Sequence, residues 1–390
     1  MTASSMNSPG TRKIAFVVPS LHGGGAEFVA RTWMAWLTSK GHEVSVITTS
    51  GKLTDQYVPE GTAAYTVSGA SGQLGKARAL AALLKKLAPD VAISLQAHAN
   101  LVLITAARSM GSNRPPVIIS ERNLVSLGLE GASASHRFKI FSARRIYRYA
   151  DHVIAISHPV AGELVSGFGV SGSRITVVPN PATAKVDPTK FVTRVPGIEN
   201  GVQLVLPCRL VVQKRPHLAI DTARALADRG IAAEVISFGG GPLEKTLIDR
   251  AAALGVTFTS MGWVENWFEH FANNSVVLLP SNREGFGNVL VEAAAARVPS
   301  VAVSGALGVA DAIVPGITGE LALTADPRDL ADAVVRASAL DVSGIDSWLR
   351  RFSPESSGND LLRVIDITIE NAASRRGVPA GASADARRVV

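Results

Sequence analysis

The segment Lys13–Glu27, KIAFVVPSLHGGGAE, joins a short apolar run to a glycine-rich turn and then to a stretch with helical spacing. Its run Ile14–Val18 is apolar throughout instead of alternating with polar residues, which is typical of a strand buried on both faces. Helical spacing continues from Ala26 to Lys40. A buried strand followed by a helix is the unit of a parallel sheet with helices on both faces, so this stretch predicts an α/β fold.

The same unit recurs along the chain. Further strands are expected at Glu43–Thr48, Val91–Ser94, Val117–Ser120, His152–Ile156, Ile175–Val178, Val202–Pro207, Ala233–Phe238, Val256–Thr259, Ser275–Leu279 and Ser300–Val303. Helices are expected in between, including one over Val264–Ala272. The pattern predicts two doubly wound sheets in tandem, with the active site in the crevice between them, because open parallel sheets bind ligands beyond the carboxyl ends of their strands.

A proline-rich stretch from Pro179 to Gly201, without apolar period, is the natural linker. We therefore expect a first domain over residues 12–182, a linker over 183–200 and a second domain over 201–350. A further helix is expected over 351–373. The Ala-, Gly-, Ser- and Arg-rich residues 374–390 are expected to be disordered.

The composition narrows the class of protein. The 390 residues are 47% hydrophobic and 18% charged, which fits globular domains. A net charge of +7 suits anionic substrates, nucleic acid or an acidic membrane surface, and only 5% aromatic residues argue against a single-strand nucleic-acid platform. The lone Cys208 fits a reducing compartment, and no apolar run approaches the ~18 residues of a spanning helix. A cytoplasmic protein is expected.

Two motifs each follow a strand and precede a helix. The three glycines Gly23–Gly25 permit close backbone approach to a ligand at a helix N-terminus, although a plain turn would also explain them. Arg209 and Lys214 stand five residues apart at the start of the second domain. These two cations could hold a diphosphate between them, although a solvated basic loop is an equally physical interpretation.

The most specific segment is Pro280–Glu292, PSNREGFGNVLVE, which follows a buried strand. Glu284 lies in the loop and Glu292 lies on the first turns of the helix. Backbone N–H groups at the helix start, those of Phe286, Gly287 and Asn288, could meet a phosphate. The carboxylates would then accept hydrogen bonds from hydroxyl groups of a ribose and a sugar. Helix capping is an alternative explanation for Glu284, but it leaves Glu292 unexplained.

Together these motifs resemble the retaining glycosyltransferases of family 4, which have two facing Rossmann-like domains, the GT-B fold. The shared patterns are G-G-A-E after the first strand, R-L-x-x-x-K opening the second domain, and P-S-x-x-E-G-F-G-x-x-x-x-E. Four more stretches agree with the family in order, namely Lys40–Val44, Val178–Pro181, Gly262–Val264 and Pro315–Gly319. The resemblance extends from about Lys13 to Leu323.

The resemblance implies roles for individual residues of the second domain. Arg209 and Lys214 would bind the diphosphate of a UDP- or GDP-sugar, Glu292 the ribose hydroxyls and Glu284 the transferred sugar. Arg209, Lys214 and Glu284 are thus the implied catalytic groups. The nucleobase is expected at the turn made by Gly262, Trp263 and Val264, although Trp263 could also be a core residue.

In the first domain, Gly24 and Gly25 would approach the donor phosphate. Many relatives place a histidine after the strand Val117–Ser120, where this chain reads Glu121-Arg122-Asn123. This variant resembles enzymes that build surface polysaccharides or lipid-linked oligosaccharides. Candidate contacts to the sugar or acceptor are therefore Glu121, Arg122, His22 and His98, although a lone histidine is more often structural.

The implied reaction moves a sugar from a nucleoside-diphosphate-sugar to a glycan or polyprenyl-linked acceptor with retention of anomeric configuration. No cofactor and no metal are expected, because the two cations would take the place of a divalent ion at the leaving diphosphate. A nucleotide-sugar epimerase and a catalytically silent nucleotide-sugar-binding protein remain alternatives. No motif supports a nucleic-acid partner.

The segment His136–Tyr149 interleaves basic and apolar residues. On a helix this gives a basic face and an apolar face. A solvated outer face over a domain core would explain the pattern. A contact with anionic lipid at the inner face of the membrane, or with a polyprenyl diphosphate acceptor, is the second interpretation.

Overall fold

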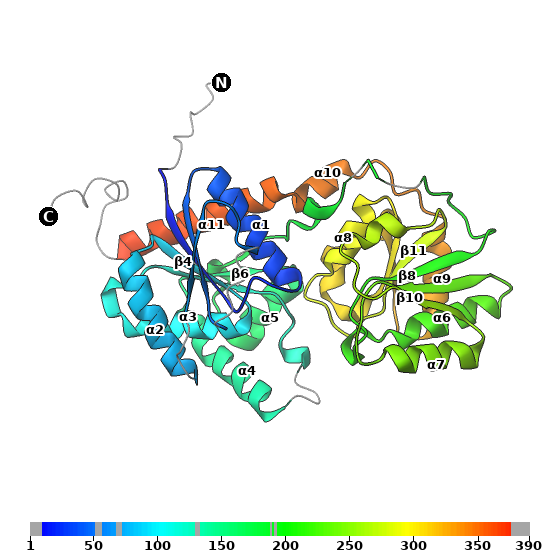
Figure 1. Cartoon of the computed structure of the whole chain (residues 1–390), viewed down its shortest axis with the longest axis horizontal. Coiled ribbons are helices and arrows are strands. Elements are labelled where there is room, and N and C mark those ends of the chain that lie inside the picture. Colours follow the sequence, from blue (N-terminus) through cyan, green and yellow to red (C-terminus); the bar gives the residue numbers. More distant parts are fainter. Residues whose placement is uncertain are drawn as a thin grey trace, which may run out of the picture.

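The computed structural model describes residues 10–50, 57–67, 72–128, 133–187, 189–190 and 193–375. Two α/β domains lie next to each other, and each is built on one parallel sheet (Figure 1). This confirms the predicted fold class of two doubly wound, Rossmann-like domains.

The first sheet has seven strands in the order β3-β2-β1-β4-β5-β6-β7. Its strands are β1 (Lys13–Val18), β2 (Glu43–Thr48), β3 (Thr62–Thr66), β4 (Val91–Leu95), β5 (Val117–Glu121), β6 (His152–Ala155) and β7 (Ile175–Val177). The connecting helices are α1 (Gly25–Ser39), α2 (Gly72–Leu87), α3 (Ala97–Ser109), α4 (Ala134–Ile146) and α5 (His158–Phe168). Ile14 and Phe16 pack into a core with α1, whereas Ala15 and Val17 pack into a core on the other face. Because both faces of β1 are covered, its sequence shows no alternation.

The second sheet has six strands in the order β10-β9-β8-β11-β12-β13. They are β8 (Val202–Leu206), β9 (Ala233–Ser237), β10 (Thr257–Ser260), β11 (Ser275–Leu279), β12 (Ser300–Val303) and β13 (Gly319–Ala322). The helices of this domain are α6 (His217–Ala227), α7 (Glu244–Leu254), α8 (Asn288–Ala295) and α9 (Pro327–Ser338). All strand pairings of the two sheets are parallel.

Three elements differ from the sequence expectation. The two strands β3 and β13 were not expected, because both are edge strands with small or polar residues, TAAYT and GELA, and lack an apolar run. The helix expected over Val264–Ala272 is wrong, since only the 3-10 turn Trp267–His270 forms there. Its apolar spacing arises because Trp267, Phe268 and Phe271 all enter one buried cluster.

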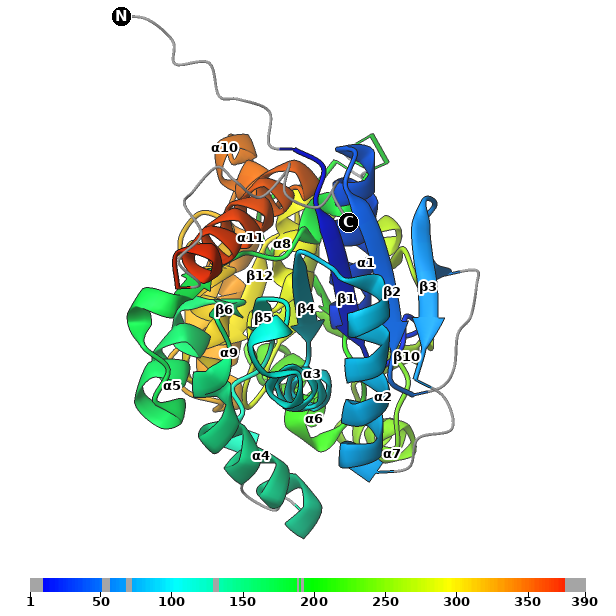
Figure 2. The ribbon, with the colours of Figure 1, turned by 90° about the vertical axis from the view of Figure 1, so that its left-hand side faces the viewer.

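The chain returns to the first domain at its end. After α10 (Asp346–Leu349) and the 3-10 turn Arg350–Phe352, helix α11 (Pro354–Arg375) packs beside α1 on the first sheet (Figure 2). The indole N–H of Trp33 donates to Ser357 Oγ at 2.8 Å, and that of Trp36 donates to Glu355 Oε2 at 2.8 Å. Helix α11 runs through Arg375, so the expected tail 374–390 is wrong for its first two residues, and the remainder lies outside the described residues.

The segment between the sheets is held mainly by the second domain. Arg194 donates from Nη1 to the carbonyl oxygen of Leu340 at 2.7 Å and from Nη2 to that of Ser338 at 2.6 Å. Earlier in the segment, the 3-10 turn Ala182–Lys185 is tied to the end of the second domain, because Thr183 Oγ1 donates to the carbonyl oxygen of Phe352 at 3.0 Å. The limits 183–200 stay a prediction.

Candidate active site

The carboxyl ends of both sheets meet each other. After β6, Ser157 Oγ donates to the carbonyl oxygen of Gly285 at 2.7 Å, across the domain boundary. The backbone N–H of His158 donates to Asp311 Oδ2 at 2.7 Å, also across the boundary. A Cβ at position 285 would lie 2.2 Å from the carbonyl oxygen of Arg122, so only glycine permits this approach of two backbones. The loops that follow the strands therefore form one joint site.

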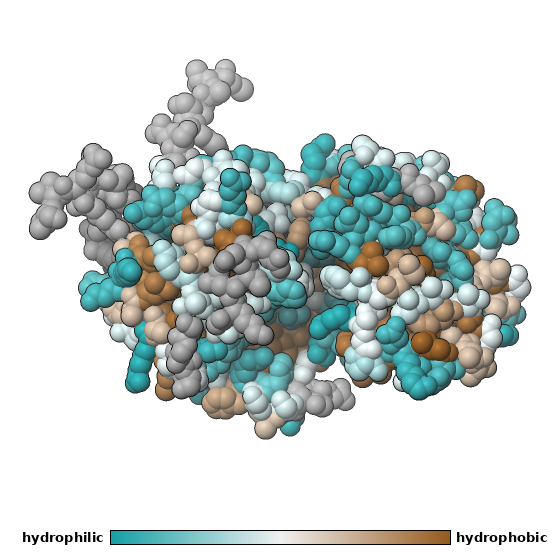
Figure 3. Space-filling view, in the orientation of Figure 1, coloured by the Kyte–Doolittle hydropathy of each residue, from teal (hydrophilic) through white to brown (hydrophobic). Residues whose placement is uncertain are grey.

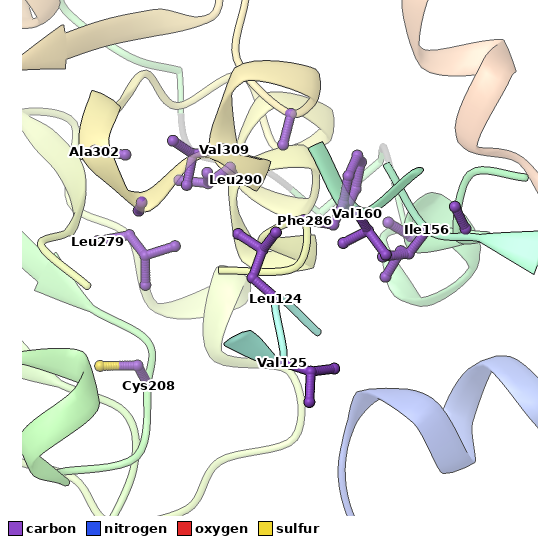
Figure 4. Packing of buried hydrophobic residues seen from close by; sticks show 14 of the residues in the cluster. Leu124, Val125, Ile156, Val160, Cys208, Leu279, Phe286, Leu290, Ala302 and Val309 are labelled. Atoms are coloured by element: carbon purple, nitrogen blue, oxygen red, sulfur yellow. The ribbon is translucent and has the colours of Figure 1, made fainter. Parts of the chain in front are cut away.

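Apolar side chains continue this junction. Phe286 is buried and belongs to a cluster that contains residues of both domains. Figure 4 shows Leu124, Ile156 and Val160 of the first domain gathered toward Phe286 of the second. Phe286 therefore contributes to the domain contact through its ring, which leaves its backbone N–H as the group that could face a ligand.

The basic loop after β8 is anchored beside the Pro280–Glu292 segment. The 3-10 turn Val212–Lys214 leads to Arg215, which has φ 45° and donates from Nε to the carbonyl oxygen of Pro280 at 2.8 Å. Its Nη2 donates to the carbonyl oxygen of Ser281 at 2.7 Å. Arg215 was not identified from the sequence, where it appears only as one more cation after Lys214. It positions Lys214 against the Pro280–Glu292 segment, called the glutamate loop from here on.

Lys214 and Glu284 form the central ion pair of the site. Lys214 Nζ donates to Glu284 Oε1, and their side chains are only 17% and 10% exposed. Arg209 is exposed, and within the described part of the chain its side chain has no recorded hydrogen bond or ion pair. The site thus holds one cation that is already paired with a carboxylate and one that faces solvent.

The loop after β12 fixes the backbone of Glu284. The N–H of Glu284 donates to the carbonyl oxygen of Ala306 at 3.0 Å, and the N–H of Gly308 donates to the carbonyl oxygen of Glu284 at 3.2 Å. A Cβ at position 308 would lie 2.4 Å from that same oxygen, so a glycine is required there. These bonds mean that two loops together hold the backbone that carries the Glu284 carboxylate.

Glu292 lies deeper, on the second turn of α8. Its side chain is buried, and the indole N–H of Trp267 donates to Glu292 Oε2 at 3.0 Å. Burial raises the pKa of Glu292, while Lys185 and the bond from Trp267 act in the opposite direction. Trp267 was not identified from the sequence, because its apolar spacing indicated a core position of a helix.

The start of α8 is in contact with the first domain. Gly287 has φ 101°, a conformation that favours glycine, and α8 begins at the next residue, Asn288. Asn180 Nδ2 donates to Asn288 Oδ1 at 2.6 Å, and Arg122 Nη2 donates to Asn180 Oδ1. A Cβ on Gly25 would lie 3.4 Å from Asn288 Nδ2. The structure thus links Arg122 to Asn288 through Asn180 and places Gly25 against Asn288. In the sequence, Asn180 stands out only as part of the Val178–Pro181 motif.

Glu121 lies inside the first domain. Its Oε1 accepts a bond from the N–H of Arg122 at 3.0 Å, and its Oε2 accepts one from the hydroxyl of Tyr147 at 2.7 Å. Asn100 Nδ2 donates to that same hydroxyl at 3.1 Å. Burial raises the pKa of Glu121 from 4.5 to about 7, against these hydrogen bonds. Both carboxylate oxygens therefore have protein partners.

The remaining candidates lie around this centre. Gly24 and His22 are exposed, and His22 contacts Tyr57 edge-on with ring centroids 5.2 Å apart. His98 is half-buried and bonded to Gln73, and burial lowers its pKa. Trp263 is 73% exposed, so the interpretation as a core residue is wrong. Together with Gly262 (φ 67°) and Val264 it follows β10, two strands away from β8.

Metal-ligand clusters and membrane spans are both missing from the described residues. No group of three or more His, Cys, Asp or Glu side chains in that part of the protein could hold a metal ion. No helix in the described part of the chain is sufficiently long and apolar to span a bilayer. The face in Figure 3 mixes hydrophilic and hydrophobic residues over both domains.

Two family models match the chain. The first, "Glycosyltransferase Family 4", covers residues 23–184, and the second, "Glycosyl transferases group 1", covers residues 201–339. The first match covers the first sheet except β1, the second covers the second sheet, and together they include the glycine turn, the basic loop and the glutamate loop.

Relatives agree with these models. The chain is 30% identical over 62% of its length to a D-inositol 3-phosphate glycosyltransferase of Geodermatophilus obscurus, and the match spans 59% of that relative, less than two thirds of its length. Among solved structures, the apo form of the lipopolysaccharide outer core galactosyltransferase WaaB has a TM-score of 0.72 and 20% identity, over 91% of this chain and 99% of that one. Anabaena HepE in complex with UDP and glucose has a TM-score of 0.69 and 20% identity over 91% and 99%. These structures show that the fold is shared.

Proposed function

The chain belongs to glycosyltransferase family 4, and we propose that it transfers a sugar from a nucleoside-diphosphate-sugar to a glycan or lipid-linked acceptor with retention of configuration. The observation that supports this most strongly is the Lys214–Glu284 pair, held where the carboxyl ends of two Rossmann-like sheets meet. A cation and a carboxylate in contact offer one group for a phosphate and one for sugar hydroxyls.

In this proposal the diphosphate lies between Arg209, Lys214 and the start of α8. Arg209 faces solvent and is available for a phosphate oxygen. The first N–H groups of α8 have no partner within the helix, and the helix dipole adds positive potential there. Charge that develops on the departing diphosphate would be stabilised by these fixed donors, which is the principal source of acceleration in such a transfer. The two cations make a metal unnecessary in this scheme.

The donor's other parts extend to both sides of the diphosphate. Glu284 would accept bonds from the transferred sugar, and Glu292 would accept them from the ribose in place of, or beside, the bond from Trp267. The turn of Gly262, Trp263 and Val264 would contact the nucleobase. Gly24 and Gly25 would approach the phosphates from the first domain, since Gly25 already lies against Asn288.

Retention is proposed from the family resemblance, and in this scheme the leaving diphosphate itself is the base. The bond from the anomeric carbon to the diphosphate breaks, and the acceptor oxygen bonds to that carbon on the same face. The acceptor proton goes to the departing phosphate oxygen. Glu121 is not placed in this step, because both of its oxygens are bonded within the first domain.

A thermal-shift panel with UDP, GDP, ADP and their common sugar conjugates tests the donor assignment, with magnesium and with EDTA. A ligand at about 100 times its dissociation constant adds about 2.7 kcal/mol of stability. The expected result is a shift with one base that is equal in EDTA and absent in Lys214→Ala. The exposed Lys85→Ala is the matched control and should keep the shift. No shift with any nucleotide would contradict the proposal, and formation of a glycoside from labelled donor separates transfer from binding alone.

We also propose that α4 contacts an anionic membrane surface. Phe138 and Phe141 are 71% and 54% exposed, and the helix lies at the outer edge of the first domain in both ribbon views (Figures 1 and 2). Residues 134–149 contain no acidic residue, while five cationic side chains occur there, at Arg137, Lys139, Arg144, Arg145 and Arg148. Exposed rings among cations fit the interface of an acidic bilayer, where rings enter the headgroup layer and cations meet lipid phosphates.

Sedimentation with vesicles of phosphatidylcholine, with and without phosphatidylserine, tests this contact. We expect binding only to the acidic vesicles, and loss of binding in Arg144→Ala/Arg145→Ala/Arg148→Ala. The matched control removes three exposed cations of α2, with Arg78→Ala/Lys85→Ala/Lys86→Ala. Equal binding of both triple variants would refute a specific role of α4.

A further inference from the structure

A pocket of about 520 Å³ opens at the junction of the domains. It lies beside the chain crossover, the stretch from α10 to α11 where the chain returns to the first domain, and apart from the residues of the candidate donor site. Its walls come from His158 at the start of α5, from the 3-10 turn with Arg350 and Arg351, and from the first turns of α11 with Asn359 and Arg363. The volume lies within the range of small-molecule sites. None of the residues assigned to the donor lines this pocket.

Both domains contribute walls to the pocket. Arg350 and Arg351 precede Phe352, whose ring lies 5.6 Å from that of Phe286 in the second domain. Arg363 is on α11, where Val364 and Ile365 enter the core of the first domain. A ligand in the pocket would therefore touch both domains at the point where the chain passes from one to the other.

The charge of the pocket walls is unbalanced. Three guanidinium groups line it, together with one carboxylate, Asp360, which pairs with Arg363 at 3.0 Å. Within the described residues, neither Arg350 nor Arg351 has a recorded ion pair. Asp346, four residues before Arg350, is bonded to Arg297 and also interacts electrostatically with Arg350. Three guanidinium groups against one carboxylate leave the lining with an excess of positive charge, which favours an anion with several oxygens, and phosphate fits the fork geometry of guanidinium groups.

Neutral hydrogen-bonding groups complete the lining. Ser347, Ser356 and Asn359 bring hydroxyl and amide groups to the same pocket. Such groups can bond to phosphate oxygens or to sugar hydroxyls. The volume exceeds that of a bare phosphate ion, so the pocket has space for an organic part as well.

We propose that this pocket binds a phosphate-bearing small molecule, and that the bound phosphate links Arg350 and Arg351 to Arg363. Such an anion would bridge the two walls and hold the second domain and α11 in the arrangement seen here. The proposal does not depend on the transferase assignment, because it uses none of the donor-site residues.

Calorimetric titrations at a fixed ionic strength of about 0.15 M test the proposal, with inorganic phosphate and with glucose 6-phosphate as probes. The pocket variants are Arg350→Gln/Arg351→Gln and, because a double variant could fold poorly, Arg363→Gln alone. The matched control Lys85→Gln/Lys86→Gln removes the same charge from α2. Lys214→Ala removes the donor-site cation and leaves the pocket intact.

We expect the pocket variants to bind at least one probe about tenfold more weakly or worse, since each lost guanidinium removes charge-assisted bonds. The control should bind as the natural sequence does, and Lys214→Ala should keep the binding that the pocket variants lose. Tighter binding of glucose 6-phosphate than of phosphate would support an organic phosphate as the ligand, and the reverse would support the free ion. No binding of either probe, unchanged affinity in both pocket variants, or loss only in Lys214→Ala would overturn the proposal. The last result would place the anion in the donor site.

Discussion

The variant Glu284→Gln distinguishes the binding of the transferred sugar from the binding of the diphosphate in the proposed donor site. In the structure Lys214 donates to Glu284, and the pair is largely shielded from water. A diphosphate that arrives must share the ammonium group with this carboxylate. A glutamine side chain at this position is neutral, so the ammonium group becomes more available and the repulsion between carboxylate and phosphate disappears. The affinity for a plain nucleoside diphosphate should therefore stay the same or increase.

The rate of sugar transfer should change in the opposite direction and fall. A hydrogen bond to a charged group contributes about 1.5–3 kcal/mol, and about 1.4 kcal/mol corresponds to a factor of ten. If Glu284 holds a sugar hydroxyl in the transition state, Glu284→Gln lowers kcat/KM by about 10- to 100-fold. Lys214→Ala should instead weaken nucleoside diphosphate binding by about 10- to 100-fold, because in the proposed function this cation binds the phosphates.

Calorimetric titration with UDP and GDP, together with initial rates of sugar transfer, measures both quantities. Exposed Glu60→Gln and Lys85→Ala are matched controls that should change neither. Circular dichroism verifies that each variant is folded. The reasoning is refuted if Glu284→Gln loses as much nucleoside diphosphate affinity as Lys214→Ala does, because the carboxylate would then act on the nucleotide.

Other parts of the structure lead to four more predictions. Because burial raises the pKa of Glu121 to about 7, its stabilising effect is complete below its unfolded pKa of 4.5 and is lost as pH rises through 7. Between pH 5 and 8, urea unfolding should show the free energy of unfolding falling by about 2–3 kcal/mol relative to Glu121→Gln, and parallel pH profiles would contradict this. Gly285→Ala places a Cβ 2.2 Å from the Arg122 carbonyl oxygen, so the domains must separate and initial rates should fall about tenfold or more. Gly358→Ala places a Cβ 2.2 Å from the Trp36 ring and should cost about 1–3 kcal/mol in thermal unfolding. The same change at Gly162, with open space around it, should stabilise its helix by about 0.5–1 kcal/mol.

The contact between the domains gives the site its shape. The bonds from Arg122 to Asn180 and from Asn180 to Asn288 connect strand β5, the chain after β7 and the start of α8. A change in the angle between the domains must break this series of bonds or move α8 with it. The candidate donor site and the arrangement of the domains are therefore coupled through these bonds.

The sequence by itself determined the fold class, most of the strands and the segments that are assigned to the donor in the proposed function. Buried parallel strands require apolar residues on both faces, so β1 and β11 can be recognised from local sequence alone. Glycine at position 287 and the acids at 284 and 292 are also local signals, because the turn and the helix start lie within one short segment.

Only the tertiary structure decided which side chains meet. Trp267 bonds to Glu292 and Asn180 to Asn288 across 25 and 108 residues of sequence, and no periodicity encodes such separations. The Val264–Ala272 segment has helical spacing yet forms only a short turn, since its aromatic residues gain more from entering one core than from a regular helix. Edge strands β3 and β13 likewise depend on backbone bonds to neighbours instead of on their own apolar content. Contacts of this kind arise from the packing of distant segments, which is why the pocket at the crossover and the coupling of the two domains could be found only in three dimensions.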